Sequence, residues 1–530
     1  MSFFLNSFSF NYAVIVPSVG SGFSLLIDTT KAGTTTNTQF NLALAPSTSY
    51  DFNIDWGDNV IESYTSSNTT GYTHTYPVSG TYLISIGERT VGGFPRVYYN
   101  STGDRLKILN ITQFGRNQFG TDWSNAFAGC TNLQISATDF ATAKTQNITN
   151  FDSTWNGCNN LRYFPAININ GATYLDRTWA NSGLINFPLI DTSKITSFNR
   201  PWQSCNSLVT FPQINTLSAN VLQNTWENCP NLVSFPAIST NNVTYFGWAW
   251  SQCTSLTSFP LIDTSKGQNF QSTWNSCTSL TAFPLIDTSK GTSFNGTWNG
   301  CNKLKDFPAI NTLSGTNFTS TWQNCTSLTA FPLIDTSKGT SFDETWSGCT
   351  SLTAFPLIDT SKGTSFYGTW SYCNKLKDFP AINTLSGTDF TYTWLNCTSL
   401  TAFPLIDTSN SITFVDTWKN CYGLSAREFP TLNMSKLGAT NGSAGGCFEG
   451  VKLTTTSYSA LLTSLCATNF NNSVTFHGGN SKYSGSVAFL ARNFLTTPIL
   501  SGGRGWTITD GGLESLINPF IFRINTSKLT

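Results

Sequence analysis

A tryptophan recurs every 24 residues through most of this 530-residue chain. The one exception is a gap of 23 residues between Trp179 and Trp202. The series consists of Trp155, Trp179, Trp202, Trp226, Trp250, Trp274, Trp298, Trp322, Trp346, Trp370, Trp394 and Trp418. A repeat this short cannot bury its own apolar side chains, and stacking on neighbouring copies supplies the missing interior. The spacing therefore predicts a solenoid with one rung for each copy.

The apolar positions around each Trp repeat as well. A Cys follows three residues after every Trp of the series except Trp179, where Ser182 takes its place. A complete copy consists of Phe318, Trp322, Cys325, Leu328, Phe331, Pro332 and Ile334, and a looser copy ahead of the series has Trp123, Phe127, Cys130 and Leu133. We expect core columns of like residues, among them Trp274, Trp298, Trp322, Trp346 and Trp370 beside Cys277, Cys301, Cys325, Cys349 and Cys373. A buried indole N–H is expected to need an acceptor.

The spacing inside the unit predicts one short helix and one short strand for each rung. Phe318, Trp322 and Cys325 stand at i, i+4 and i+7, on one face of a two-turn helix, and residues 341–344 (Ser-Phe-Asp-Glu) have the capping-box pattern. The Phe-Pro-Leu-Ile-Asp segment predicts an extended stretch, and Asp-Thr-Ser-Lys-Gly behind it is turn chemistry. Because proline lacks an N–H, we expect the strand ladder to bend or end there.

The cysteines favour a buried thiol column. The chain has 14 Cys, nearly all in the repeat, and each thiol is interpreted as a small apolar group in a corner too tight for Leu. Disulfides between rungs are an alternative, since a Cα spacing of about 5 Å permits them. A metal column is another alternative, with little support because His74 and His477 are the only histidines. Cysteine usage leaves the redox compartment open.

Alternating apolar and polar residues ahead of the repeats predict a small β-sandwich over residues 21–95. Its Trp-Gly-Asp motif ending at Asp58 and its His-Thr-Tyr motif starting at His74 resemble those of PKD-type immunoglobulin-like domains. Asp55 and Asp58 have the oxygen ligands that Ca²⁺ uses, but a turn-stabilising role is favoured. His74 is expected to pack in a strand and not to act as a base.

The predicted fold class is an α+β, leucine-rich-repeat-like solenoid between a β-sandwich and an α/β cap. The cap is expected because a solenoid must cover its last open face. Phe3, Phe4, Phe8 and Phe10 favour an N-terminal docking peptide, with a disordered tail as the alternative. The predicted parts are residues 1–20 for docking, 21–95 for the sandwich, 96–122 for a linker and first solenoid strand, 123–450 for about 13 rungs, and 451–530 for the cap.

Charge and hydropathy narrow the range of functions and locations expected for this chain. The 28 basic residues equal the 28 acidic ones, and only 11% of residues are charged where about 25% is usual, so no nucleic-acid partner is expected. Apolar runs such as residues 13–16 fall far short of the roughly 18 residues of a membrane span, so membrane insertion is not expected. Because the first 17 residues hold neither Lys nor Arg and no sustained apolar core, a secretory signal peptide is not expected.

The whole pattern resembles the BspA-type leucine-rich-repeat surface proteins. The resemblance rests on the Cys-x-x-Leu units, the PKD-like region and the segment GDRLKILNITQFG at residues 103–115, and it covers about residues 21–512. Members of this family usually have Phe where this chain has Trp, and Phe127 keeps that form. The resemblance implies a non-enzymatic, adhesive protein of bacterial surfaces or bacteriophage particles, without a cofactor.

Near-identical copies favour a virion component. Residues 302–316 recur unchanged at 374–388, and this duplication, the low charge and the missing export signal favour a phage fibre or decoration protein on the virion surface. A secreted adhesin on the bacterial cell surface is the alternative. The expected partners are a host-surface glycan or protein, or other virion or envelope proteins, and a homo-oligomer is allowed. A passive spacer that uses only its ends is a third interpretation.

The copies differ most at the positions flanking each Thr-Trp pair. These positions fall between the inward residues of the expected helix, so they should face water. We hypothesise that this face carries recognition, with Trp248, Tyr367, Tyr372 and Tyr392 as anchors for sugar rings or a protein surface. Simple drift at tolerant solvent positions is the competing explanation.

A polysaccharide-degrading solenoid enzyme is the remaining alternative. Stacked Asp335 and Asp359 are expected about 5 Å apart, near the separation of a retaining glycosidase pair. However, the same position recurs as Asp191, Asp263, Asp287 and Asp407, with Asn at Asn215, Asn311 and Asn383. A catalytic pair is singular, whereas a column of Asp or Asn is typical of an Asx-turn in every rung. The sequence therefore predicts no catalytic residues.

Overall fold

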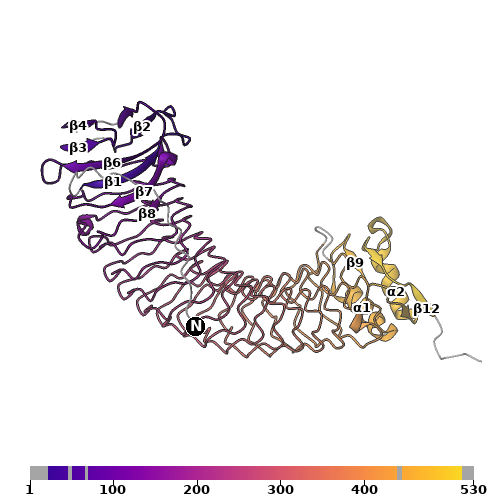
Figure 1. Cartoon of the computed structure of the whole chain (residues 1–530). Helices are drawn as coiled ribbons and strands as arrows, with labels where there is room; N and C mark the ends of the chain where they lie inside the picture. The colour runs from indigo at the N-terminus through magenta and orange to yellow at the C-terminus, as the bar shows by residue number, and fades with distance from the viewer. Residues whose placement is uncertain (1–21, 46–49, 66–69, 439–443, 516–530) are drawn as a thin grey trace, which may run out of the picture.

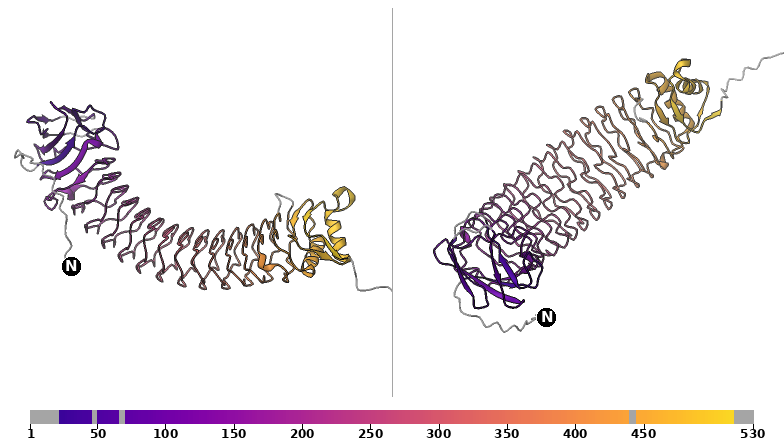
Figure 2. Two further views of the ribbon diagram at one scale, coloured as in Figure 1. Left: turned by 45° about the vertical axis from the view of Figure 1, so that its right-hand side comes forward. Right: turned by 90° about the horizontal axis from the view of Figure 1, so that it is seen from above.

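The chain forms a long arched solenoid with a β-rich unit at its N-terminal end and a helical cap at the other (Figures 1 and 2). A computed structural model describes residues 22–45, 50–65, 70–438 and 444–515. The predicted docking segment, residues 1–20 with Phe3, Phe4, Phe8 and Phe10, lies outside the described residues. None of the described helices is long and apolar enough to cross a membrane.

The N-terminal unit contains two sheets. The larger has the strand order β4-β3-β6-β1-β7-β8, and β2 pairs with β5 in the smaller. The strands are β1 (Phe23–Asp28), β2 (Gln39–Leu42), β3 (Phe52–Asp55), β4 (Ile61–Tyr64), β5 (Tyr72–Thr75), β6 (Thr81–Glu88), β7 (Ile108–Gln113) and β8 (Gln134–Ile135). Strand β7 is antiparallel to β1 and parallel to β8, which belongs to the first rung. The sheet of the N-terminal unit thus continues directly into the solenoid.

A buried ion pair stabilises the junction between the N-terminal unit and the solenoid. Asp104 and Lys107, at the short 3₁₀ helix η1 (Arg105–Lys107), are fully buried, and their charged atoms lie 3.8 Å apart. The Asp104 carboxylate accepts hydrogen bonds from the backbone N–H groups of Thr34, Thr35 and Asn41 at 2.8 to 3.0 Å. Burial lowers the pKa of the Lys107 ammonium group, which donates to the Gln39 carbonyl oxygen at 2.7 Å. Such a pair persists because every charged atom has partners.

The predicted helix of each rung is wrong. The segment around Trp322 is a run of turns, in which Ser320 and Asn324 have left-handed backbone with φ of 52° and 58°. Every second backbone N–H group donates a hydrogen bond to the next rung. The N–H of Trp322, for example, donates to the Thr345 carbonyl at 2.9 Å. The intervening ones close local turns, as from Cys325 to the Trp322 carbonyl at 3.2 Å. Stacking thus provides an acceptor in the next rung for half of the backbone N–H donors. In a two-turn helix the first four N–H groups would have no partner.

The capping-box interpretation of residues 341–344 is wrong for the same reason. Glu344 has a left-handed backbone with φ of 53°, which an N3 residue of a helix cannot have. Its carboxylate accepts a hydrogen bond from the Gln323 side chain of the preceding rung at 3.0 Å. The pattern that suggested a cap therefore serves the contact between rungs.

The strand of each rung shortens to isolated parallel bridges. One series runs through the residue before each inner Phe, as in Ser293 with Asn317, and another stands just before Phe-Pro, as in Ala282 with Asp306. Pairing stops at the Phe-Pro step, as the missing proline N–H predicted. The Pro-Leu-Ile-Asp stretch behind it forms no bridge in the described rungs, so the extended segment is not a strand.

The core consists of stacked ring columns. All twelve Trp of the series are fully buried, and successive rings lie 5.4 to 5.9 Å apart with nearly parallel planes. The Phe rings of the Phe-Pro pairs stand across them, with Trp322 and Phe331 centroids 4.8 Å apart at 74°. However, the twelve indole Nε1 atoms have no hydrogen-bond partner, so the expectation of an acceptor is wrong. Aromatic edge-to-face packing takes the place of a hydrogen bond.

Buried Thr residues tie the rungs together. In ten of the twelve copies a Thr precedes the Trp and is fully buried. The Thr321 hydroxyl lies within hydrogen-bond distance of the Phe318 carbonyl at 2.7 Å and of the Phe294 carbonyl at 2.9 Å. One hydroxyl thus reaches its own rung and the rung before it. Sequence reasoning missed this column, although the Thr-Trp pair recurs in most copies.

The repeat cysteines are buried free thiols. Their sulfur atoms approach the carbonyl oxygen of the preceding rung's Trp, as Cys325 does toward Trp298 at 3.3 Å. Burial raises the pKa of these thiols well above the ordinary value of 9.0. The thiol is therefore held protonated as a weak donor.

The cap begins where the last rung ends. Ala444 bridges Phe476 in β9 (Thr475–His477), which pairs in parallel with β11 (Thr507–Thr509). The other elements are α1 (Thr455–Thr468), β10 (Tyr483–Ser484), α2 (Ser486–Thr496) and β12 (Leu513–Ser515). Tyr458, Leu461, Leu462 and Leu465 form the buried face of α1, as their spacing predicted.

Candidate binding surface

The variable positions of the repeat coincide with a special backbone conformation. Residues two before and two after every Trp of the series have left-handed backbone. Glycine, Asn and Ser fill most of these positions, as Gly296 and Asn324 do, because they accept a positive φ at little cost. Trp248, Tyr372 and Tyr392 occupy the same positions with φ of 57°, 61° and 60°. A bulky side chain there carries strain of about 1 kcal/mol or more, which clusters at functional sites.

The four candidate anchors reach solvent to different degrees. Tyr367 and Tyr372 are 37% and 48% exposed, whereas Trp248 and Tyr392 are half-buried. Trp248 belongs to the rung of Trp250, five rungs before that of Trp370. At about 4.8 Å for each rung, it lies roughly 24 Å from the tyrosines. The four anchors therefore do not form one site.

The structure brings two of the anchors together. The rings of Tyr367 and Tyr392 come from consecutive rungs and meet edge to face, with centroids 5.3 Å apart and planes at 83°. Burial, the neighbouring Tyr392 and the carboxylates of Glu344, Asp389 and Asp343 raise the pKa of Tyr367. The geometry is that of a small aromatic surface bordered by acidic groups.

The carboxylates around this pair are held in place. Asp343 accepts a hydrogen bond from the Ser365 hydroxyl, and Asp389 accepts one from the Thr391 N–H at 2.8 Å. Lys419, at the C-terminal end of this row, is paired with Glu449 at 3.0 Å. The Tyr367–Tyr392 surface, defined by these two rings with Asp343, Glu344 and Asp389, is therefore anionic.

The aspartate column forms Asx-turns. Asp335 accepts hydrogen bonds from the Ser337 N–H at 2.9 Å and the Ser337 hydroxyl at 2.7 Å, and Asn383 accepts one from the Leu385 N–H. These bonds lower the pKa of Asp335, whereas the general acid of a glycosidase needs a raised pKa. The Asx-turn interpretation is confirmed.

Asp335→Ala is expected to lower the free energy of unfolding by about 1 kcal/mol, since it removes the turn's acceptor. Asp335→Asn should be nearly neutral, because Asn already fills this position in other rungs. Urea unfolding of both variants measures the difference. An equal loss in the two variants would show that charge matters and the turn does not.

The aspartates of the N-terminal unit are also turn acceptors. Asp55 accepts a hydrogen bond from the Gly57 N–H at 2.9 Å, and Asp58 accepts one from the Val60 N–H at 3.2 Å. The second oxygen of Asp58 lies 2.8 Å from Nε2 of His74, whose ring stacks on Trp56 at 4.8 Å. The turn-stabilising roles of Asp55 and Asp58 and the packing of His74 in strand β5 are confirmed. Within the described ranges, no cluster of three His, Cys, Asp or Glu residues could hold a metal ion.

Comparison with known proteins gives only distant likenesses. No protein family and no curated protein matches the sequence significantly. Among solved structures, the TLR13–ssRNA13 complex is similar over 72% of this chain and 58% of its own, at 13% identity and a TM-score of 0.23. The leucine-rich-repeat ectodomain of the plant membrane receptor kinase GASSHO1/SCHENGEN3 from Arabidopsis thaliana, in complex with CASPARIAN STRIP INTEGRITY FACTOR 2, has 9% identity, a TM-score of 0.18, and coverage of 77% and 56%.

A third structure, the plant peptide hormone receptor RGFR1 in complex with RGF2, has 11% identity, a TM-score of 0.18, and coverage of 75% of this chain and 82% of its own. The chain spans less than two thirds of the length of the first two structures. Likenesses at these TM-scores identify no residue of a binding site, which rests on the geometry described above.

Proposed function

We propose that this chain is a non-enzymatic recognition protein whose rigid solenoid presents the Tyr367–Tyr392 surface to a partner. One observation carries the proposal: Tyr392 packs edge to face on Tyr367 from a left-handed position that most other rungs fill with Gly, Asn or Ser. A Tyr at this position strains the backbone, and such strain clusters at functional sites. The paired rings and fixed carboxylates supply what carbohydrate recognition uses, a ring face for stacking and acceptors for hydroxyl groups.

The favoured ligand is a neutral or amino-bearing glycan. Asp343, Glu344 and Asp389 repel an acidic sugar, so specificity follows from charge as well as from shape. A polysaccharide-degrading activity has less support, because the repeated aspartates are held by turn hydrogen bonds. Release of reducing sugar from the bound glycan would establish that alternative.

The sequence also supports a proposal for where the protein is located. We assign the chain to a virion surface, as a fibre or decoration protein with a PKD-like N-terminal unit, with a bacterial cell surface as the alternative. The support is the BspA-type repeat and the near-identical copies at residues 302–316 and 374–388. Immunogold electron microscopy of particles and of cells distinguishes the two locations.

Alanine at both Tyr367 and Tyr392 is expected to weaken glycan binding at least tenfold, as the loss of a central aromatic anchor does. The probe is an array of immobilised neutral, amino-bearing and acidic oligosaccharides. Tyr163→Ala is the matched control, since Tyr163 is 61% exposed and lies many rungs away. Unchanged binding by the double variant, or binding mainly to acidic sugars, contradicts the proposal.

A further inference from the structure

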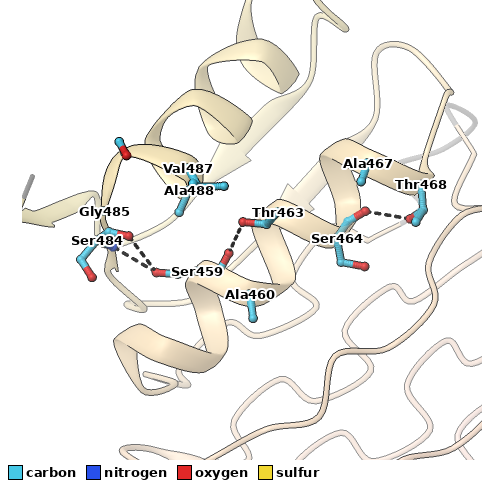
Figure 3. A pocket seen from close by; sticks show the side chains of 11 residues that line it. Ser459, Ala460, Thr463, Ser464, Ala467, Thr468, Ser484, Gly485, Val487 and Ala488 are labelled. Atoms are coloured by element: carbon cyan, nitrogen blue, oxygen red, sulfur yellow. Dashed lines mark hydrogen bonds between the residues drawn. The ribbon is translucent and has the colours of Figure 1, made fainter. Parts of the chain in front are cut away.

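The cap contains an open groove between α1 and the start of α2. It has a volume of about 640 Å³ and is lined by Ser459, Ala460, Thr463, Ser464, Ala467 and Thr468 of α1 and by residues 484–488 (Figure 3). No lining side chain is larger than Val487. The Thr463 and Thr468 hydroxyls donate to the Ser459 and Ser464 carbonyls at 2.8 Å, so their hydrogen-bonding capacity is directed to the helix backbone. The groove therefore has room for large apolar side chains.

An apolar face of α2 that is exposed in the described part of the chain adjoins this groove. Val487, Leu490 and Phe494 stand at i, i+3 and i+7 on α2, and Val487 also lines the groove. Val487 and Leu490 are 64% and 65% exposed, and Phe494 is 40% exposed. A stripe of this kind on a short helix marks a surface that another segment covers.

The chain leaves the described structure at the rim of the groove. Strand β12 runs parallel to β10, and the last described residue, Ser515, is the register partner of Ser484. Ser484 itself lines the groove. The described chain therefore ends beside the groove.

The sequence that follows suits this surface. Five of the seven residues from 516 to 522 are apolar, and none is charged: Leu516, Ile517, Asn518, Pro519, Phe520, Ile521 and Phe522. Extended at about 3.3 Å for each residue, seven residues span roughly 23 Å. The 11 residues of α2 are about 16 Å long, so this segment can reach every part of the uncovered face.

We propose that residues 516–522 of the same chain dock into this groove and cover the outer face of α2. The distance from Ser515 favours the chain's own segment over that of a second copy, because the effective concentration of a tethered segment is high. Phe520 and Phe522 supply the large side chains that the short lining residues admit.

The first test compares two full-length double variants. Phe520→Ser with Phe522→Ser should increase the fluorescence of the apolar dye ANS about threefold and speed hydrogen exchange in α2 about tenfold. Ile524→Ser with Leu529→Ser removes apolar groups outside residues 516–522 and should change neither measurement. Equal behaviour of the two variants overturns the proposal. A parent protein that is dimeric in solution and becomes monomeric only in the first variant assigns the segment to a partner copy, which also overturns it.

The second test fills the groove. Ala467→Trp should displace the segment and speed tryptic cleavage after Arg523 about tenfold, because cleavage follows the population of the undocked form. Ser501→Trp, on the 3₁₀ turn η4 (Ile499–Ser501) outside the groove, is the control and should leave the rate unchanged. An unchanged rate in Ala467→Trp overturns the proposal.

Discussion

Above pH 9 the solenoid is expected to lose stability steeply and unfold in the alkaline range. Thirteen of the 14 cysteines of the chain are buried. Burial raises the pKa of Cys205 to about 11 and that of Cys301 and Cys349 to about 12, from an ordinary value of 9.0. Between pH 9 and these values the thiols ionise in the unfolded chain but stay protonated in the folded one. Because the unfolded chain then binds fewer protons, the free energy of unfolding falls as pH rises.

The expected size of this effect is large. Each such thiol lowers the free energy of unfolding by about 1.4 kcal/mol for every pH unit inside its window. Thirteen groups acting independently remove on the order of 10 kcal/mol within one unit, as much as the stability of a typical domain. Below pH 9 the contribution is fully present, so the protein is stable through the neutral range.

Circular dichroism between pH 7 and pH 12 measures this transition. Cys325→Ser is the matched control, because Ser182 already occupies this position in one rung and lies 3.3 Å from the Cys205 sulfur. In this variant, unfolding at alkaline pH should release one proton fewer, so the free energy of unfolding should fall less steeply with pH. This difference separates thiol ionisation from tyrosine ionisation. At pH 8, a thiol reagent should modify only the partly exposed Cys466 in the folded protein. Rapid reaction of several thiols, or full stability at pH 12, contradicts the expectation.

The core of the solenoid was predictable because it depends on spacing alone. A 24-residue period places Trp322 over Trp298 whatever the local backbone does, so the columns follow from the register. The rung backbone was not predictable in this way. The spacing of Phe318, Trp322 and Cys325 fits a helix, but the acceptor for the Trp322 N–H is the Thr345 carbonyl of another rung. Local patterns do not reveal an acceptor 23 residues away.

The binding surface was predictable only in part. Comparison among copies drew attention to Tyr367 and Tyr392, yet their contact depends on two neighbouring rungs that both carry Tyr. The strained backbone of Tyr392 had no signal in the sequence, because the helix expected there has a negative φ. The buried pair Asp104 and Lys107 was missed as well, since sequence alone does not distinguish a buried charge from an exposed one.

Trp322→Ala is expected to lower the free energy of unfolding by about 3 to 5 kcal/mol. The side chain is fully buried between the rings of Trp298 and Trp346 and against Phe331, so truncation leaves a cavity that rigid neighbours cannot close. Trp322→Phe should cost less than about 1.5 kcal/mol. A phenyl ring continues this column at its end, where Phe448 stacks on Trp418 at 5.2 Å. The exchange also removes the indole N–H of Trp322, which has no acceptor and therefore contributes no hydrogen bond to stability.

Urea unfolding followed by circular dichroism measures both variants, and the slope with denaturant shows whether the same part of the chain unfolds in each. Leu333→Ala is the control for the same region, because Leu333 is 65% exposed and should change stability by less than about 0.5 kcal/mol. Equal losses for Trp322→Ala and Trp322→Phe would mean that the indole N–H does bind an acceptor in solution. A small loss for Trp322→Ala would mean that the rungs do not depend on the ring column, and the solenoid would then be held together by its backbone and Thr hydrogen bonds alone.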